Sequence, residues 1–184
     1  MKRAWSIAVV ALTFPLVACL EADGDTGEEL AQQELGAEGA CEKVYREDVV
    51  IEADLERVWD LLIDLPRYAD WNPWIVYANG DAIPGTKVPV GVVLSGKVLD
   101  MKYDIVSVEP QVRFCTKDDA WFTLFVDGSR CRMVELQADG TVHFWQELTV
   151  KGPFTWLADL TFAKEMRAGM AAETAALKAT AEAP

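Results

Sequence analysis

The chain has 184 residues, of which 51% are hydrophobic and 26% charged, and 17 Lys and Arg residues against 30 Asp and Glu residues give a net charge of -13. This length suits one domain of ordinary size with a single core. The acidic excess repels phosphate backbones, which excludes a nucleic-acid-binding surface based on counterion release and a basic membrane-binding patch. With one histidine, His143, and four scattered cysteines, the sequence has no cluster with the spacing of a metal site, and it indicates no cofactor.

The N-terminus has the layout of an export signal. Lys2 and Arg3 precede an apolar stretch from Ala4 to Val17. This stretch is too short to span a bilayer comfortably as a permanent helix, so we interpret it as a secretory leader.

The leader ends in Leu16-Val17-Ala18-Cys19, which resembles the lipobox of bacterial lipoproteins. In those proteins the cysteine is acylated and becomes the first residue of the mature chain. We therefore expect residues 1–18 to be a lipoprotein signal peptide and Cys19 to carry a lipid anchor; the alternative is an ordinary signal peptide cleaved near Ala18. Leu20 in place of an aspartate implies, by the enterobacterial sorting pattern, an outer-membrane location in the bacterial cell envelope, facing the periplasm or the cell surface.

Residues 19–40 predict a flexible tether. The segment from Glu21 to Ala40 contains seven carboxylates, no basic residue and no aromatic residue, with four glycines spread through it. Such a segment buries too little apolar surface to offset its ordering entropy, and its like charges repel one another. Residues 41–184 remain as the folded domain.

The domain opens with a strand and two short helices. Val44 to Ile51 is rich in β-branched and aromatic residues and predicts a strand. Asp54 can cap a helix whose apolar residues recur at helical spacing through Ile63. Pro66 can begin a second short helix, which Asn72-Pro73 closes.

The period then changes to two, which predicts a run of strands. Ser95-Gly96 indicates a tight hairpin turn. In the strand that follows this turn, Leu99, Met101 and Tyr103 share one face. The predicted strands are 75–79, 88–94, 97–108, 112–117, 130–136 and 141–150.

The segment from Phe154 to about Thr180 predicts one long helix, because alanines give it a high helix propensity. An apolar stripe should face the sheet; its members are Leu157, Leu160, Ala163, Met166, Met170 and Leu177. A curved antiparallel sheet has one apolar face, and only this helix is long enough to cover it. We therefore expect an α+β fold in which a curved sheet wraps around a C-terminal helix, with two short helices after the first strand.

Several motifs resemble the SRPBCC (START-like) superfamily, and especially its polyketide cyclase/dehydrase-like members. They include the run from Glu52 to Asp64, the run from Tyr68 to Trp74, Val108-Glu109-Pro110 and Asp139-Gly140-Thr141. The resemblance covers about residues 42–182. It implies a helix-grip domain with an apolar cavity that holds a lipid, sterol or polyketide-like molecule. We also expect the protein to use no cofactor and to be a monomer.

Fold alone does not choose among binders, carriers and enzymes. An open, wholly apolar cavity would favour a binding protein, whereas an open cavity with converging ionisable groups would favour a cyclase/dehydrase or hydrolase. A cavity filled by the protein's own side chains would favour an interaction module of the envelope.

Arg130 and Arg132 share a strand face with Val134 and Leu136. If that face lines the cavity, each guanidinium needs a partner, because burying an unpaired charge is costly. The partner is either an acidic group of the ligand or a carboxylate of the core, or else the strand end lies at the cavity mouth.

The remaining predicted ligand contacts are Trp74, Tyr77, Leu99, Met101, Tyr103, Trp121 and Phe122. Trp121 and Phe122 lie in a connection between two strands that can overhang the cavity entrance in this fold. His143 and Glu147 lie on one strand face, but the apolar face of that strand is the opposite one, so we expect both to face solvent and assign no catalytic residue.

The cysteines predict one disulfide. If the two strands around 112–117 and 130–136 pair as an antiparallel hairpin, Cys115 and Cys131 lie directly opposite each other. Cys41 would then be free or available for an intermolecular bond. The alternative is three buried thiols that never oxidise.

Overall fold

The computed structural model describes residues 41–119 and 126–184. Its strands are β1 (Glu42–Ile51), β2 (Ile75–Ala78), β3 (Lys87–Leu94), β4 (Lys97–Glu109), β5 (Arg113–Asp119), β6 (Asp127–Leu136) and β7 (Val142–Lys151). Its helices are α2 (Leu55–Ile63), the short 3-10 helix η2 (Leu65–Arg67), α3 (Tyr68–Trp71) and α4 (Thr155–Ala181). The predicted leader, Cys19, the tether, Trp121 and Phe122 lie outside the described residues.

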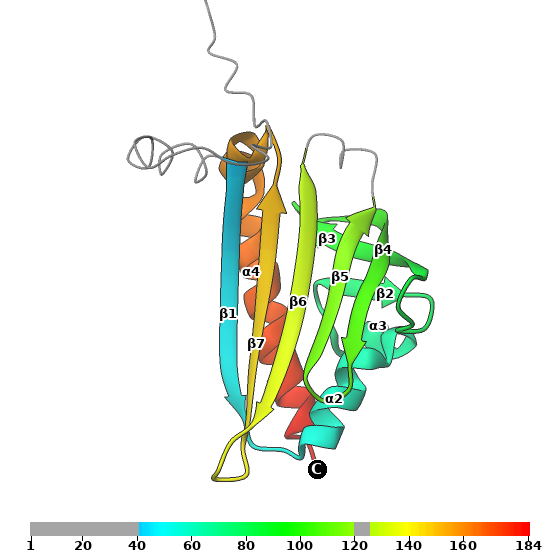
Figure 1. Cartoon of the computed structure of the whole chain (residues 1–184), viewed down its shortest axis with the longest axis vertical. Coiled ribbons are helices and arrows are strands. Elements are labelled where there is room, and N and C mark those ends of the chain that lie inside the picture. Colours follow the sequence, from blue (N-terminus) through cyan, green and yellow to red (C-terminus); the bar gives the residue numbers. More distant parts are fainter. Residues whose placement is uncertain (1–40, 120–125) are drawn as a thin grey trace, which may run out of the picture.

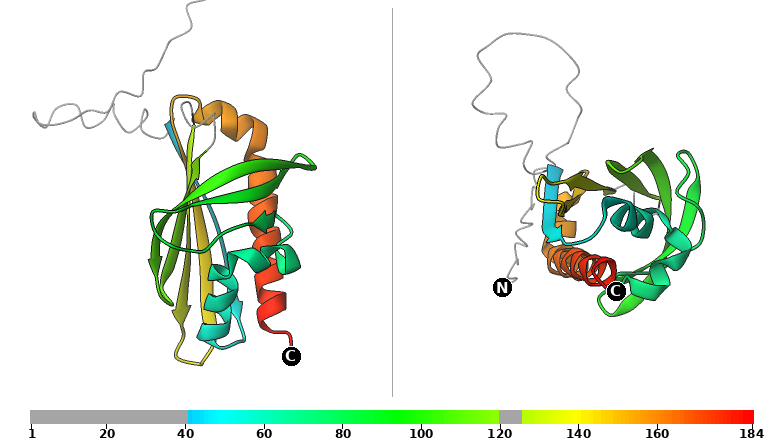
Figure 2. Two further views of the ribbon diagram at one scale, coloured as in Figure 1. Left: turned by 90° about the vertical axis from the view of Figure 1, so that its right-hand side faces the viewer. Right: turned by 90° about the horizontal axis from the view of Figure 1, so that it is seen from below.

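All seven strands belong to one antiparallel sheet with the order β1-β7-β6-β5-β4-β3-β2. The first and last strands of the chain are therefore neighbours, and β2 forms the opposite edge. The sheet curls into a half-barrel, and α4 runs along its concave side (Figures 1 and 2). This arrangement confirms the predicted α+β helix-grip fold, including the short helices after the first strand.

The β3–β4 hairpin forms as the sequence predicts. Leu94 pairs with Lys97, so Ser95 and Gly96 are the whole turn. Both residues have positive φ, 51° and 71°, which is the backbone of the turn whose twist matches that of a hairpin. This turn carries the hairpin towards α4, where the Ser95 hydroxyl lies 3.5 Å from the Glu165 carboxylate.

The predicted stripe on α4 is correct from Ala163 onward, because Ala163 and Met166 pack against the core. Met170 and Leu177 are fully buried, whereas Leu157 is 44% and Leu160 78% exposed. The reason is geometric: a step of three residues rotates the side chain back by about 60°, so repeated steps of three leave the inward face. Phe162, one four-residue step before Met166, continues the inward stripe but is itself 39% exposed. In the part of the chain that the structure describes, no helix is long and apolar enough to cross a membrane.

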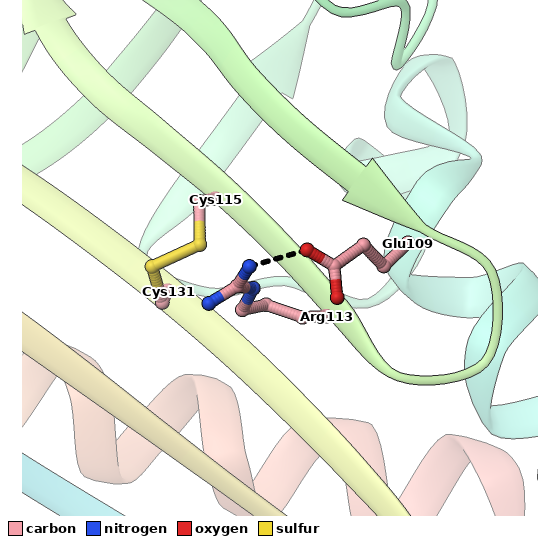
Figure 3. The surroundings of a disulfide bond; sticks show 4 residues. All are labelled: Glu109, Arg113, Cys115 and Cys131. Atoms are coloured by element: carbon pink, nitrogen blue, oxygen red, sulfur yellow. Dashed lines mark hydrogen bonds and ion pairs between the residues drawn. A yellow bond between two sulfur atoms is a disulfide. The ribbon is translucent and has the colours of Figure 1, made fainter.

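The predicted register between β5 and β6 is confirmed, because Cys115 pairs with Cys131. Their sulfurs lie 2.08 Å apart in a disulfide that joins the two strands, beside the ion pair of Glu109 and Arg113 (Figure 3). The expectation that Cys41 is free is wrong: Cys41 is also disulfide-bonded.

Candidate functional site

A cluster of three charged side chains lies between the sheet and α4. Alternation along β6 directs Arg130 and Arg132 to the concave side, where Glu173 of α4 meets both. Arg130 Nη1 donates to Glu173 Oε2 at 2.9 Å, and Arg132 Nε donates to Glu173 Oε1 at 2.8 Å. The three residues are 3%, 1% and 0% exposed. Of the alternatives left open by the sequence, the structure shows the ion pair with a core carboxylate.

All three groups are charged at neutral pH. Burial alone would raise the pKa of Glu173, but the charges of Arg130 and Arg132 outweigh it and lower this pKa below its usual value. Burial likewise disfavours the charged form of Arg132, but Glu173 raises its pKa overall. The cluster therefore holds two positive charges and one negative charge.

Aromatic rings enclose the two guanidinium groups. Arg130 lies over the Trp74 ring at 4.6 Å and over the Tyr103 ring at 5.9 Å from the centroid, and Arg132 lies 5.6 Å from the centre of the Phe114 ring. The faces of such rings attract cations. Two of the predicted ligand contacts, Trp74 and Tyr103, thus lie against the predicted arginines.

Gln146 on β7 forms a second polar contact between sheet and helix. Its Nε2 donates to the Met170 carbonyl at 3.1 Å and to Thr174 Oγ1 at 2.9 Å. Sequence reasoning missed both Gln146 and Glu173. A signal for Glu173 existed, because it follows Met170 by three residues and so lies near the inward face of α4.

The interior beside this cluster is almost filled. A cavity of about 10 Å³ is lined by Arg132, Tyr68, Tyr103 and Thr116, together with apolar side chains. That volume is enough for roughly one water molecule. The Tyr68 hydroxyl donates to the Leu62 carbonyl at 2.7 Å, and burial raises the pKa of Tyr68 to about 12.

The apolar interior reaches the surface at one end of the domain. On the inward row of β4, Tyr103 is buried and Met101 is half-buried, but Leu99 is 40% exposed. Phe162, on the inward stripe of α4, is 39% exposed. Both elements therefore leave apolar, inward-facing side chains open near the β3–β4 turn.

Tyr77, another predicted ligand contact, lies away from the arginine cluster. Its ring packs over Gly91, where a Cβ would lie 2.3 Å from a ring carbon, and its hydroxyl donates to Asp100 at 2.5 Å. Gly91 alternates with Val90 along β3, and Val90 lines the internal cavity. Tyr77 is therefore on the outer face of the sheet, where an irregularity in the pairing of β2 with β3 places it.

His143 and Glu147 also face outward, as predicted. His143 Nε2 lies 3.5 Å from Asp48 Oδ2, and the Arg46 Nε to Glu147 Oε1 distance is 2.9 Å. Each has its own surface partner, so they do not form a pair of a base and an orienting carboxylate. Within residues 41–119 and 126–184, no group of His, Cys, Asp or Glu side chains could hold a metal ion.

The family described as "Polyketide cyclase / dehydrase and lipid transport" matches residues 43–182, which is nearly all of the described domain. The chain belongs to this family. No curated protein matches the chain significantly.

Solved structures share the fold of this family member at low identity. The Zhui aromatase/cyclase from Streptomyces sp. R1128 has a TM-score of 0.61 and 14% identity, covering 77% of this chain and 94% of that one. A START superfamily protein from Mycobacterium smegmatis has a TM-score of 0.58 and 15% identity, covering 76% and 97%. A norcoclaurine synthase point mutant from Thalictrum flavum, in complex with a transition-state analogue, has a TM-score of 0.60 and 15% identity, covering 76% and 94%.

Proposed function

We propose that the domain binds a small, mainly apolar molecule at the end where its interior reaches the surface. The observation that carries this proposal is the exposure of Leu99 and Phe162 on rows whose deeper members are buried. Apolar side chains left open on the concave side of a curled sheet are a natural binding surface for a lipid-like molecule. The family, whose description includes lipid transport, supports the same class of ligand.

The test uses a fluorescent acyl-chain probe whose emission rises in apolar surroundings, titrated into the purified mature chain. Phe162→Ser should weaken binding about tenfold, because it removes an apolar side chain from the proposed contact. Leu160→Ser is the matched control: it lies on the same helix and is more exposed, but it is off the inward stripe. Equal effects of the two substitutions would contradict the proposed location.

A second function, an interaction module of the envelope, is favoured by one observation. The internal cavity of about 10 Å³ is too small for any lipid unless side chains move. The same titration separates the two functions, because an interaction module binds no acyl probe. Native mass spectrometry of the purified protein adds a second readout, since a co-purifying lipid would support ligand binding.

We do not propose catalysis. In the described part of the cluster, the only carboxylate in contact with the arginines is Glu173, and both of its oxygens accept from guanidinium groups. Its lowered pKa makes it a poor general base near neutral pH.

We also propose that the protein is exported and anchored to a bacterial membrane, at the outer membrane, through an acylated Cys19. This proposal requires that the disulfide of Cys41 does not use the Cys19 sulfur. The chain enters the domain at Cys41, whose carbonyl accepts from Gly152 N and Thr155 Oγ1. The exposed Trp156 and Leu160 lie close by on the first turns of α4. The tether of roughly 20 residues that the sequence predicts would span about 25 Å, which would keep this end of the domain near the anchor.

Fractionation of cells that express Cys19→Ser tests the anchor. The variant should leave the membrane fraction or accumulate unprocessed, because two or more acyl chains give persistent binding. Mass spectrometry of the mature N-terminus should show acylation in the unaltered protein. A peptide that links Cys19 to Cys41 by a disulfide would refute the assignment, because acylation uses the same sulfur.

A further inference from the structure

We infer that the Arg130–Glu173–Arg132 cluster binds a monovalent anionic group. The group is either the carboxylate of an amphipathic ligand or a small inorganic anion. The carboxylate source rests on the proposed binding of an apolar molecule, whereas the inorganic source does not.

The two guanidinium groups have unused hydrogen-bonding capacity. Arg130 Nη2, Arg132 Nη1 and Arg132 Nη2 are buried and have no hydrogen-bond partner. Each of these nitrogens carries two N–H donors, and a buried donor without a partner is unfavourable. Each carboxylate oxygen of Glu173 already accepts a hydrogen bond from one arginine, so Glu173 leaves these donors unsatisfied.

The cluster also carries more positive than negative charge. Within the three-residue cluster, two guanidinium groups and one carboxylate leave a surplus of one positive charge. Tyr68 and Tyr103 face the cluster as neutral phenols, because burial raises the pKa of both. Asp118 on β5 interacts with Arg130 through its charge, which lowers the pKa of Asp118 against the effect of burial, but the structure shows no ion pair between Asp118 and either arginine. Charge surrounded by aromatic rings is weakly screened, which strengthens its attraction for an anion.

The interior beside Arg132 also contains a small cavity. Arg132 lines the cavity of about 10 Å³, together with Thr116 and the two tyrosines. The cavity is the size of one water molecule, so a halide ion, which is larger, enters only if the side chains around the cavity move. A ligand carboxylate would need Trp74 or Tyr103 to shift, because these rings lie over Arg130.

Two measurements test the site with the mature full-length chain. The first compares a fluorescent fatty acid with its methyl ester, which has the same tail and no charge. The acid should bind about tenfold more tightly, because only it can accept from the free guanidinium donors. The second measures the thermal midpoint in sodium chloride, bromide or iodide against sodium sulfate at equal ionic strength, where a monovalent anion site gives a halide-specific rise.

The variant Glu173→Gln adds a second test to both measurements. It removes the internal competitor, so it should raise the affinity for the acid and for halides, while a purely structural role of Glu173 predicts no such gain. Arg132→Lys keeps the charge but loses the planar donors, and it should reduce the preference for the acid over the ester.

The outcomes distinguish the two sources of the anion, and they distinguish the anion site from the proposed function. A preference for the acid supports the ligand carboxylate. Halide stabilisation without binding of either probe supports a small-anion site and refutes the proposed function. Equal binding of acid and ester, with no halide effect and no gain in Glu173→Gln, overturns the anion site and leaves the proposed function intact.

Discussion

Replacement of Glu173 by glutamine should strongly destabilise the fold. The side chain is fully buried and makes two charge-assisted hydrogen bonds, of 2.9 Å and 2.8 Å. Glutamine keeps the shape but loses the charge, and its amide group must turn N–H donors towards a guanidinium. Breaking a buried ion pair by changing one partner costs about 3–5 kcal/mol, which is a large part of a typical stability of about 5–15 kcal/mol.

Urea denaturation of the mature chain at neutral pH measures this loss. Glu165→Gln is the matched control on the same helix, because Glu165 has only a long contact with Ser95. We expect the control to stay within about 0.5 kcal/mol of the unaltered protein. A loss of less than about 1 kcal/mol in Glu173→Gln would refute the reasoning, because the arginines would then not depend on this carboxylate.

The same variant has a predicted pH signature. The folded-state pKa of Glu173 is lowered, so its contribution to stability is present above the unfolded pKa of about 4.3 and is lost as the pH falls through the folded value. The difference in stability between the two proteins should therefore narrow in acid, starting at about pH 5.

Three further substitutions test other contacts. Gly169→Ala should cost about 1–3 kcal/mol in urea, because its Cβ would lie 2.4 Å from the Trp74 indole, and an unchanged midpoint would contradict this close packing. Replacing Cys115 and Cys131 by serine should lower stability by about 3 kcal/mol, and non-reducing peptide mapping of the unaltered protein should recover the two linked peptides. Burial raises the pKa of Asp118 to about 6, so its charged form destabilises the fold at neutral pH. Asp118→Asn should therefore raise the free energy of unfolding by about 1–2 kcal/mol at pH 7 and leave it unchanged near pH 4. An increase that does not depend on pH would exclude this cause.

Local patterns in the sequence determined the elements and much of their pairing. The alternation along 97–108 and the Ser95-Gly96 turn predicted the β3–β4 hairpin, because a two-residue turn leaves one register. The opposition of Cys115 and Cys131 was predicted because the midpoint of their sequence positions falls in the connection between the two strands, and the structure confirms this register. The motif resemblance predicted the helix-grip fold, since it covered nearly the same residues as the family match.

The candidate site depended on features that no local pattern contains. Period two placed Arg130 and Arg132 on one face, but it could not say that Glu173, 43 and 41 residues later, would bind both. That contact depends on how α4 is rotated and shifted against the sheet. The same rotation exposes Leu160, and an irregularity in strand pairing places Tyr77 on the outer face.

The sequence by itself therefore determined the order of the elements, the registers of the β3–β4 and β5–β6 hairpins and the inward faces of β4 and β7, because these follow from backbone geometry over a few residues. Only the tertiary structure decided which charges meet in the interior and how little space remains beside them. Those features arise from the packing of one long helix against a curled sheet, where a rotation of a single residue along α4 would bring a different side chain to Arg130 and Arg132.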